Sequence, residues 1–374
     1  MADRRPRTDS EPVRIAVIGA GSIGQVHARL AAAEPDCRLV AIADPAPGAA
    51  ALATELGATW YPDHHDLLAR EWIDGAVVAV PTGLHAEVGI DCAAAGVHLL
   101  VEKPIAGRLD DGLRLVDAAA SAGVRILVGH HRRYDPAVET ARAIVRSGEL
   151  GRLVLVTAVW AARKPDDYWA ASWRSAAGGG PVLINLIHDI DGLRHICGEI
   201  AQVQAFTSRA IREFEVEDSA AILLRFANGA IGTITASDVA VSPWTWEAGT
   251  NDNPAVAWSG QNSYRFMGTD GSLEFPNLVT WRHDGATPGD WGVPLVARPV
   301  GLGPRDARAN QLRHFCAVIR GHEPPRVDGR DALGTLAATL AVHEAAASGR
   351  PVAPAPTGAP GPGGDRPPTA DARA

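Results

Sequence analysis

Short apolar runs alternate with alanine-rich stretches along the first part of the chain. The apolar runs have the length and composition of strands buried on both faces of a parallel sheet, and they cover residues 14–18, 39–43, 75–80, 98–101 and 126–128. The stretches between them favour helices and cover residues 25–33, 46–56, 84–95 and 109–122. Strands that alternate with helices form right-handed crossovers, so the pattern predicts a doubly wound α/β domain over residues 13–135.

The pattern changes near residue 151, where apolar and polar positions begin to alternate over longer segments. These segments cover residues 153–159, 201–209, 219–226, 231–236, 263–267 and 272–275. Such alternation is typical of an antiparallel sheet packed on one face, and Asn228-Gly229 and Asp270-Gly271 favour hairpins between successive strands. With two late helices over 307–320 and 329–348, the pattern predicts a second, α+β domain over residues 136–350, whose late helices pack back on the body.

The two ends of the chain lack this periodicity. Residues 1–12 carry a short basic block, and residues 351–374 are rich in Pro, Gly and Ala, so we expect a disordered leader and a disordered tail. No early segment has the pattern of a signal peptide, and no apolar run is long enough to cross a bilayer. We therefore expect a cytoplasmic protein.

The charge balance argues against nucleic acid and membrane surfaces as partners. The chain has 35 Lys and Arg against 43 Asp and Glu, and its formal net charge is -8. This balance offers no broad cationic surface to a polyanion or an anionic lipid. We therefore expect a small-molecule partner.

The cysteines and histidines do not have the spacing of metal ligands. The four cysteines are Cys37, Cys92, Cys197 and Cys316, which lie far apart and are typical of reduced core residues. His64-His65 and His130-His131 are adjacent pairs that lack the i, i+4 spacing of zinc ligands on a helix. We expect no metal.

A glycine-rich turn, Gly19-Ala20-Gly21-Ser22-Ile23-Gly24, follows the first predicted strand and opens the first predicted helix. In this context the first glycine permits a tight turn, the second lets the backbone approach a pyrophosphate, and the third allows close helix–strand packing. The free N–H groups of the helix then face the phosphates. The turn predicts a Rossmann dinucleotide site.

Asp44 ends the second predicted strand, 20 residues after Gly24. A carboxylate at this place accepts hydrogen bonds from the ribose hydroxyls of NAD and repels the 2′-phosphate of NADP. Pro45, rather than an arginine, follows it. We therefore expect NAD as the cofactor, with NADP the poorer ligand.

Glu102-Lys103-Pro104 stands directly after the strand predicted at 98–101, at the edge where open α/β sheets bind ligands. An ammonium here could hydrogen-bond a substrate hydroxyl and stabilise alkoxide character as hydride leaves. The tripeptide is equally compatible with a surface lysine in a loop. Its spacing alone leaves both interpretations open.

Several further motifs make the chain resemble the Gfo/Idh/MocA family of oxidoreductases. The motifs are residues 19–24 followed by His27, Pro81-Thr82-x-x-His85, Glu102-Lys103-Pro104, Gly129-x-x-Arg132-Arg133-Tyr134, Trp173-Arg174, Gly178-Gly179-Gly180 and His188-x-x-Asp191. The resemblance covers residues 13–351. It implies an N-terminal Rossmann domain that binds NAD and a C-terminal domain over 136–350 for substrate binding and oligomerisation, built on a mostly antiparallel open sheet. It also implies homodimers or homotetramers assembled through that sheet.

The resemblance also implies roles for two residues. Lys103 matches the family's active-site lysine, and His188 matches a histidine that acts as general base in inositol dehydrogenase-like members. A neutral imidazole with an ordinary pKa near ~6.5 suits proton transfer at neutral pH better than an ammonium does. We therefore assign proton transfer to His188 and substrate orientation with charge stabilisation to Lys103.

Together the motifs and the resemblance predict two sets of binding residues. The cofactor-binding set is Gly19, Gly21, Ser22, Ile23, Gly24, Asp44, Pro81, Thr82, His85, Glu102 and Lys103. The substrate-binding set is Arg132, Trp173, Arg174, Asn185, His188 and Asp191.

The chain departs from the family four residues before the histidine, where sugar and inositol dehydrogenases commonly have Asp and this chain has Ile184. An apolar residue cannot orient an imidazole or stabilise its charge. If the segment is helical, Asn185 and Asp191 share a face with His188, so that Asn185 binds substrate and Asp191 orients the ring. The alternative is that Asp191 only ties the helix to the sheet.

These observations leave three hypotheses about function. The leading one is an NAD-dependent dehydrogenase that oxidises a secondary alcohol of a sugar, cyclitol or related polyol to a ketone. The second is a dehydrogenase of a cis-dihydrodiol of an aromatic carboxylate, because tryptophans and Arg174 suit a flat anionic ring. The third is a dinucleotide-binding regulator without catalysis, which the presence of both Lys103 and His188 disfavours.

Overall fold

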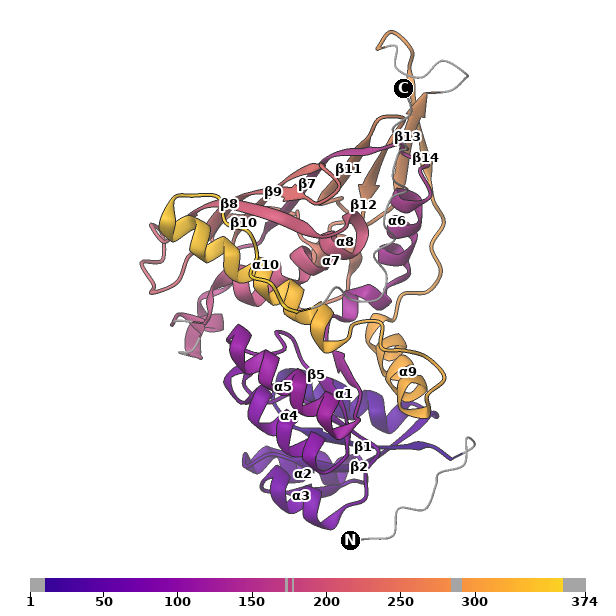
Figure 1. The fold of residues 1–374 in the computed structure, drawn as a ribbon, viewed down its shortest axis with the longest axis vertical. Helices are drawn as coiled ribbons and strands as arrows, with labels where there is room; N and C mark the ends of the chain where they lie inside the picture. Colours follow the sequence, from indigo (N-terminus) through magenta and orange to yellow (C-terminus); the bar gives the residue numbers. More distant parts are fainter. Residues whose placement is uncertain (1–10, 172–173, 177, 284–290, 359–374) are drawn as a thin grey trace, which may run out of the picture.

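The computed structural model describes residues 11–171, 174–176, 178–283 and 291–358. Most of the leader and tail expected at 1–12 and 351–374 therefore lies outside the described residues. The chain forms two layered bodies, one around each of two sheets, and the late helices lie between and beside them (Figure 1).

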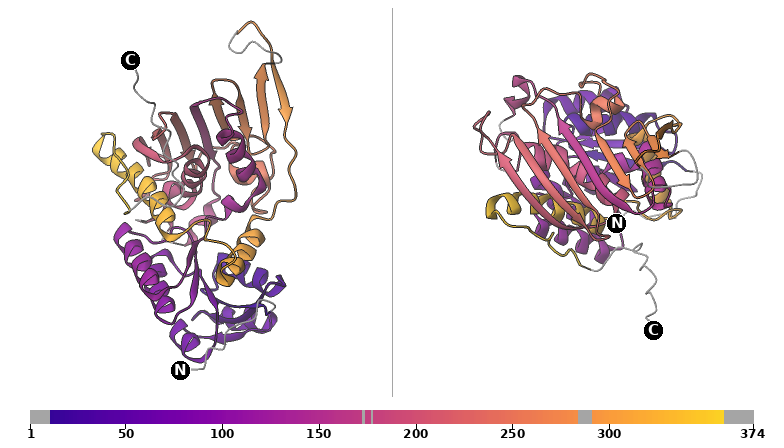
Figure 2. Two further views of the ribbon diagram at one scale, coloured as in Figure 1. Left: turned by 45° about the vertical axis from the view of Figure 1, so that its right-hand side comes forward. Right: turned by 90° about the horizontal axis from the view of Figure 1, so that it is seen from above.

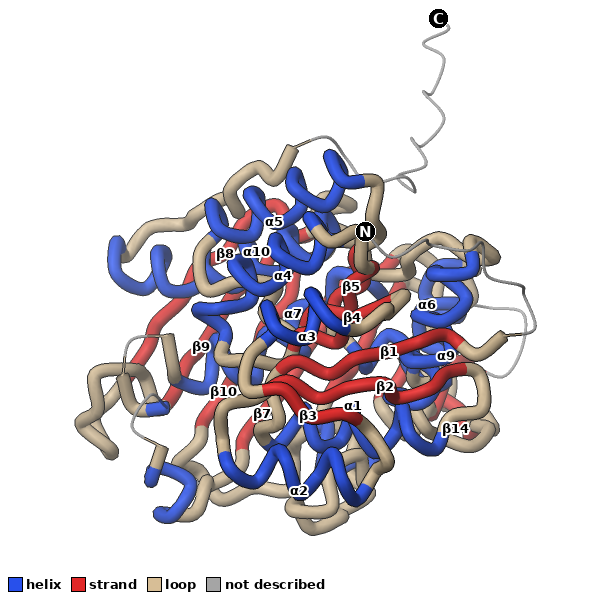
Figure 3. Tube along the Cα trace, turned by 90° about the horizontal axis from the view of Figure 1, so that it is seen from below, coloured by secondary structure: helices blue, strands red, loops and turns tan. Residues whose placement is uncertain are grey.

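The first sheet has six strands in the order β3-β2-β1-β4-β5-β6, all paired in parallel. Its strands are β1 (Val13–Ile18), β2 (Cys37–Ala43), β3 (Thr59–Tyr61), β4 (Gly75–Val78), β5 (His98–Val101) and β6 (Ile126–Val128). Its helices are α1 (Ser22–Ala33), α2 (Pro47–Glu55), α3 (His64–Arg70), α4 (His85–Ala94) and α5 (Leu109–Ala122), and they cover both faces of the sheet (Figure 3). The predicted doubly wound fold is confirmed.

The sequence pattern missed β3 and α3. Strand β3 has three residues and lies at the edge of the sheet, and α3 has seven residues, so neither shows a clear period. Helix α3 did carry a start signal, because the carboxylate of Asp63 accepts a hydrogen bond from the backbone N–H of Asp66 at 2.9 Å.

The second sheet has eight strands in the order β14-β13-β12-β11-β7-β10-β9-β8. Its strands are β7 (Leu153–Ala161), β8 (Ile200–Ser208), β9 (Ser219–Phe226), β10 (Ile231–Ser237), β11 (Tyr264–Gly268), β12 (Ser272–Phe275), β13 (Val279–His283) and β14 (Leu295–Pro299). All its pairs are antiparallel except β7 with β10. Both predicted hairpins, β9–β10 and β11–β12, are present, and Gly229 has the positive φ that the first one uses. The sequence pattern missed β13 and β14.

Helices cover only one face of the second sheet, and the other face looks outward (Figure 2). The helices that follow the first sheet along the chain are α6 (Pro136–Arg146), α7 (Ile187–Cys197), α8 (Trp246–Thr250), α9 (Ala307–Arg320) and α10 (Gly329–Ser348), of which α9 packs on the first domain. Short helical turns add η1 (Thr82–Leu84), η2 (His131–Tyr134), η3 (Asp166–Ala170) and η5 (Val182–Leu186). The pattern missed α6, although Pro136 stands in its first turn and Asp135 caps it.

The late helices pack back on the body as expected and join the two sheets. Phe315 of α9 is buried in the core of the parallel sheet. Leu336 of α10 packs into that domain, whereas Val342, farther along α10, packs under the second sheet. The space between the sheets is therefore bounded by fixed elements, and the site described next lies there.

All four cysteines are free and buried, as the sequence analysis expected. None of the described helices combines the length and apolarity that crossing a bilayer requires.

Candidate active site

The glycine-rich turn between β1 and α1 is shaped by close contacts on one side and open space on the other. Gly19 has φ +96°, and a Cβ there would lie 2.5 Å from the carbonyl oxygen of Ala79. A Cβ on Gly24 would lie 1.9 Å from the carbonyl oxygen of Gly19, so neither position accepts a side chain. A Cβ on Gly21, in contrast, would have nothing within 4 Å of it.

Helix α1 leaves its first N–H groups for a ligand. It begins at Ser22, its N-cap is Gly21, and no side chain caps it. No acidic residue stands in its first turn, so the helix dipole and the N–H groups favour an anion there. With the open space above Gly21, these features fit the pyrophosphate of a dinucleotide. The predicted residues of this turn thus lie between β1 and the first turn of α1, as the sequence analysis expected. They are Gly19, Gly21, Ser22, Ile23 and Gly24.

Asp44 lies directly after β2 and beside the glycine-rich turn. Its Oδ2 accepts a hydrogen bond from the backbone N–H of Ala20 at 2.6 Å, and its Oδ1 accepts from that of Ala46 at 2.7 Å. Each carboxylate oxygen has a further lone pair that a ribose hydroxyl can use. Asp44 therefore shapes the turn, and its bond to the ribose stays a prediction.

The turn after β4 holds Pro81, Thr82 and His85 in different environments. Pro81 is exposed and Thr82 half-buried, at the edge where the cofactor is expected. His85 is 1% exposed, and its Nδ1 and Nε2 lie 2.8 and 2.9 Å from the carbonyl oxygens of Pro104 and Val80. The expectation that His85 binds the cofactor directly is wrong. Its ring instead ties this turn to the loop that carries Lys103.

Glu102 follows β5 and is buried. Its Oε1 lies 2.8 Å from Nε2 of His27, and its Oε2 accepts a hydrogen bond from the backbone N–H of Lys103 at 3.0 Å. Burial raises the pKa of Glu102, but the hydrogen bond from His27 and the neighbouring positive charges outweigh it and lower the pKa to about 2. Glu102 thus anchors the Lys103 loop to α1 as a charged group, and His27 is a structural partner that the sequence analysis did not assign.

The Lys103 side chain crosses from the first domain to the second. Its Nζ donates a hydrogen bond to the backbone carbonyl oxygen of Ile184 at 2.9 Å. Burial lowers the pKa of Lys103, while the charge of Glu102 opposes that shift. Of the two interpretations of this lysine, the structure favours the active-site one, because the side chain is half-buried and its ammonium lies against the segment that carries His188.

That segment begins with one π-helical stretch, η5, and continues as α7. A π turn widens the helix and is often found at functional sites. The backbone N–H of Val182, at its start, donates to Oε1 of Glu217 at 2.9 Å. The predicted helix is present, but the π turn means that Asn185 and His188 do not share one regular helical face. The Oδ1 atom of Asn185 is buried and has no hydrogen-bond partner among the described residues.

His188 is held by neighbouring rings rather than by a carboxylate. Its Nδ1 is buried without a hydrogen-bond partner among the described residues. The His131 ring lies 5.2 Å away between centroids, at an interplanar angle of 78°, and the His130 ring lies 6.4 Å away. Burial lowers the pKa of His188 well below 6.5, and the positive charges of Lys103 and Arg132 lower it further. The imidazole is therefore neutral at neutral pH and can accept a proton.

The expectation that Asp191 orients the His188 ring is wrong. Nε and Nη2 of Arg133 donate to the two oxygens of Asp191 at 2.8 and 2.6 Å. The hydroxyl of Thr335 donates to Oδ1 of Asp191 at 2.9 Å. Because strong partners occupy both oxygens and the residue is 1% exposed, Asp191 ties α7 to η2 and α10 and is not placed to bind a substrate.

Arg132 belongs to a buried network that sequence spacing could not reveal. Its Nη2 donates to Oε1 of Glu247 at 2.7 Å, and its Nη1 lies 3.5 Å from Oδ1 of Asp189. Asp189 also accepts a hydrogen bond from the hydroxyl of Tyr264. Burial raises the pKa of Asp189 to about 6, against the opposing charge of Arg132. The predicted Arg132 thus lies beside His188 with three polar neighbours from distant parts of the chain.

The other predicted substrate contacts are less closely tied to this centre. The Arg174 guanidinium lies 4.0 Å from the centroid of the Tyr168 ring and donates to the carbonyl oxygen of Tyr168 at 2.5 Å. One of the five N–H donors of Arg174 is therefore used within its own loop. Trp173 lies outside the described residues.

Away from this centre, His64 and His65 meet Asp91 on the surface of the first domain. The His64 Nε2 atom lies 2.9 Å from Oδ2 of Asp91, and the ligand atoms of all three residues lie within 4.8 Å of one another, a group that could hold a metal ion. The sequence argument against metal considered the spacing of cysteines and histidines and missed Asp91, which comes from α4.

Family models match both halves of the chain. The model of the oxidoreductase family's NAD-binding Rossmann fold matches residues 13–130, and the model of the GFO/IDH/MocA C-terminal domain matches residues 138–274. The chain belongs to the Gfo/Idh/MocA oxidoreductase family. The resemblance stated from the motifs is confirmed.

Curated relatives and solved structures agree with this assignment. The scyllo-inositol 2-dehydrogenase (NAD(+)) of Bacillus subtilis is 28% identical over 355 residues, which are 91% of this chain and 96% of that protein. The myo-inositol 2-dehydrogenase of Thermotoga maritima is 32% identical over 328 residues, or 85% and 92% of the two chains. The WlbA dehydrogenase of Bordetella pertussis, solved with NADH and UDP-GlcNAcA, has a TM-score of 0.76 and 27% identity over 92% of this chain and 99% of that one.

The fold, the dinucleotide site and the family together establish the class of protein. The chain is an NAD(P)-dependent oxidoreductase that acts on CH–OH groups, and NAD is its cofactor.

Proposed function

We propose that this oxidoreductase oxidises a secondary alcohol of a sugar, cyclitol or related polyol to a ketone. One observation carries the proposal: the bond from Lys103 Nζ to the Ile184 carbonyl brings a lysine of the first domain onto the segment that presents His188. The relatives named scyllo- and myo-inositol 2-dehydrogenase support a cyclic polyol, and the solved relative with UDP-GlcNAcA supports a sugar.

The cofactor, when bound, supplies the hydride acceptor. The glycine-rich turn would hold its pyrophosphate at the start of α1, and Asp44 would hold the ribose. Pro81, Thr82 and the anchored Glu102-Lys103 loop line the edge of the sheet where the nicotinamide would lie. The chain therefore fixes where the transferred hydrogen must arrive.

The other step of the reaction is the removal of the proton of the substrate hydroxyl. His188 is neutral, because burial and nearby cations hold its pKa down, and it accepts this proton. The ammonium of Lys103 donates a hydrogen bond to the same oxygen and stabilises the negative charge that develops there. Arg132, fixed by Glu247 and Asp189, and Asn185 orient the other hydroxyls of the substrate.

A substrate panel tests the proposal. The purified protein is given NAD and a series of inositols, sugars and cis-dihydrodiols of aromatic carboxylates, and NADH formation is followed by absorbance. We expect turnover with at least one inositol or sugar and none with the dihydrodiols. Tight NAD binding without turnover of any polyol would overturn the proposal and favour a regulatory protein, whereas turnover confined to the dihydrodiols would favour the second hypothesis.

A further inference from the structure

His188 needs an outlet for the proton that it accepts. The positive charges of Lys103 and Arg132 disfavour a protonated ring at this place, and the buried Nδ1 has no carboxylate to balance it among the described residues. The protonated form of His188 is therefore high in free energy, and the ring must transfer its proton to another group.

The carboxylates around the site are nearly all engaged elsewhere. Asp191 is held by Arg133 and Thr335, and Glu102 lies against His27. Asp189 is bonded to Tyr264, close to Arg132. Among the described contacts, none of these carboxylates bonds the His188 ring.

Glu247 is engaged in the same way. Its Oε1 accepts a hydrogen bond from Arg132 at 2.7 Å, and its Oε2 accepts one from the indole N–H of Trp160 at 3.2 Å. Neither bond connects it to His188.

His130 and His131 both meet His188 edge to face, but only the His131 ring is also hydrogen-bonded to a carboxylate among the described residues. The Nδ1 atom of His130 lies 3.7 Å from Oδ1 of Asp191, and neither ring nitrogen of His130 has a hydrogen-bond partner there. The His131 ring lies 5.2 Å from the His188 ring between centroids. On its other side, Nε2 of His131 lies 3.2 Å from Oδ2 of Asp252, which is 121 residues away in sequence. Because a carboxylate only accepts hydrogen bonds, Nε2 carries the hydrogen, and the neutral ring has its lone pair on Nδ1.

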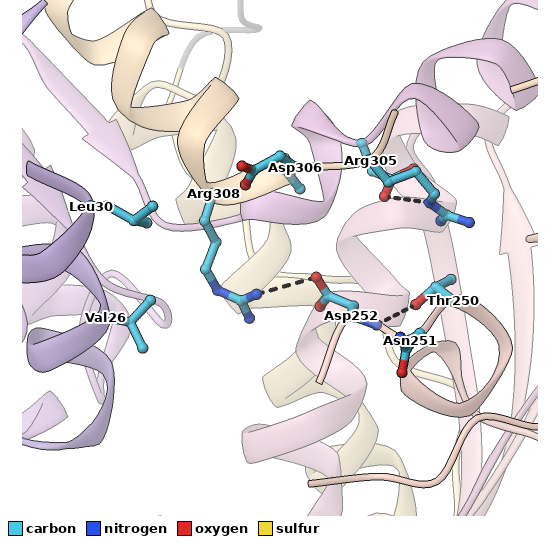
Figure 4. Close-up of a pocket in the computed structure, with 10 residues that line it drawn as sticks. Val26, Leu30, Thr250, Asn251, Asp252, Arg305, Asp306 and Arg308 are labelled. Carbon is cyan, nitrogen blue, oxygen red and sulfur yellow. Dashed lines mark hydrogen bonds and ion pairs between the residues drawn. The ribbon is translucent and has the colours of Figure 1, made fainter. Parts of the chain in front are cut away.

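Asp252 connects this pair to solvent. It lines a pocket of about 250 Å³ between α1, α8 and the start of α9, together with Arg308, Val26 and Leu30 (Figure 4). The Nη1 atom of Arg308 lies 3.2 Å from Oδ1 of Asp252, so Arg308 and His131 contact different oxygens of this carboxylate. The ring and the carboxylate thus join the active site to an open pocket on the far side of η2.

We propose that His131 and Asp252 form a relay that carries the substrate proton from His188 to the pocket lined by Asp252 and Arg308. His188 takes the hydroxyl proton and passes it to Nδ1 of His131, the ring nitrogen that does not bond Asp252. The hydrogen on Nε2 of His131 leaves through Asp252 to water in the pocket, so one proton enters and one leaves. In this chain the relay does the work that a carboxylate paired directly with His188 would do.

This inference rests on the proposed function, so its test uses a substrate found active in the panel. His131→Asn keeps a donor for Asp252 but cannot accept and release a proton, and Asp252→Asn removes the charge. We expect each variant to lower kcat by about tenfold to a hundredfold, with KM and NAD affinity nearly unchanged. The relay also predicts that imidazole added to His131→Gly restores turnover, an effect that a purely structural role would not produce.

His195→Asn is the matched control. The Nε2 atom of His195 lies 2.7 Å from Oε1 of Glu139, so this variant breaks a buried histidine–carboxylate pair of the same kind. His195 is seven residues beyond His188, about 10 Å farther along α7. We expect His195→Asn to leave kcat close to that of the parent. Equal kcat in the parent and His131→Asn, or no rescue by imidazole, would overturn the relay while leaving the proposed function intact.

A measurement without substrate tests the relay separately from the proposed function. In histidine-labelled protein, ¹⁵N spectra should show His131 protonated on Nε2 at neutral pH, and Asp252→Asn should shift this tautomer preference. An Nδ1-protonated His131 in the parent would overturn the relay even if no polyol were turned over.

Discussion

The ammonium of Lys103 donates to the backbone carbonyl of Ile184 at 2.9 Å and so joins the loop after β5 to the helix that carries His188. The bond uses a backbone atom, so it does not depend on the side chain at position 184. It leaves the other two N–H bonds of the ammonium for substrate. A lysine placed in this way orients substrate and stabilises charge at the same time.

Lys103→Ala should therefore change both binding and turnover. We expect kcat to fall by roughly a hundredfold and KM to rise, because the ammonium bonds the substrate oxygen in both the ground and the transition state. Steady-state kinetics with the active polyol measure both effects. Lys103→Arg is the control for charge alone, and we expect it to recover little, since a planar guanidinium does not reproduce the ammonium geometry. Unchanged kcat in Lys103→Ala would show that this lysine has no part in the reaction.

Ile184→Asp should move the acid side of the pH profile. A carboxylate four residues before His188 would favour the protonated ring and raise the low pKa of His188. His188 acts while neutral, so the rate falls as the pH drops through this pKa, and a higher pKa moves the fall to higher pH. The pH dependence of kcat/KM measures the shift. Ile184→Asn, which has a similar size and no charge, should leave the profile in place.

Asp44→Asn should narrow the preference for NAD. The substitution keeps the size of the side chain and removes the charge that repels a 2′-phosphate. We expect the affinity ratio of NAD to NADP to fall by about tenfold, comparable to one charge-assisted hydrogen bond of ~1.5 kcal/mol. Calorimetric titration of both dinucleotides checks this. Equal affinities in the unmodified protein would contradict the role given to Asp44.

Whether the sequence predicts a feature of the fold or of the site depends on how far apart along the chain the residues that form it lie. The glycine-rich turn and Asp44 could be predicted, because their chemistry lies in one βαβ unit. The contact of His131 with Asp252 spans 121 residues, and that of Tyr264 with Asp189 spans 75, so only the folded chain brings them together.

Asp191 shows why a correct local prediction can still give a wrong role. Its spacing from His188 correctly places both residues on one helix, α7. Its partners, Arg133 and Thr335, come from η2 and α10, which helical spacing cannot include. A bidentate hydrogen bond from a guanidinium to a carboxylate is stronger than a hydrogen bond from a neutral imidazole, so Asp191 binds Arg133 and not His188.

The outward face of the second sheet should form an oligomer interface. Four neighbouring strands each carry a large exposed apolar side chain on this face. They are Phe206 (75% exposed), Leu223 (56%), Ile231 (52%) and Leu155 (41%). Apolar side chains gathered on one face of a sheet are typical of a surface that another subunit covers. We expect light scattering to give a mass above the 39.1 kDa of one chain, and Leu223→Glu to lower it. Val241→Glu, in a loop outside the sheet, should not. A monomer at micromolar concentration would contradict the prediction.

His188→Ala should separate chemistry from binding. We expect kcat to fall by roughly a hundredfold or more, the usual contribution of a positioned general base, while NAD affinity stays almost unchanged. In the parent, the acid fall of kcat/KM that belongs to His188 should come well below pH 6.5, because burial lowers the pKa of His188 well below that value. The alkaline fall should come below pH 10.5, since burial lowers the pKa of Lys103. His188→Ala should lose the acid fall and keep the alkaline one. If its turnover and its acid fall both matched the parent's, the base would have to be another group, and His131, with Asp252 behind it, would be the first to test.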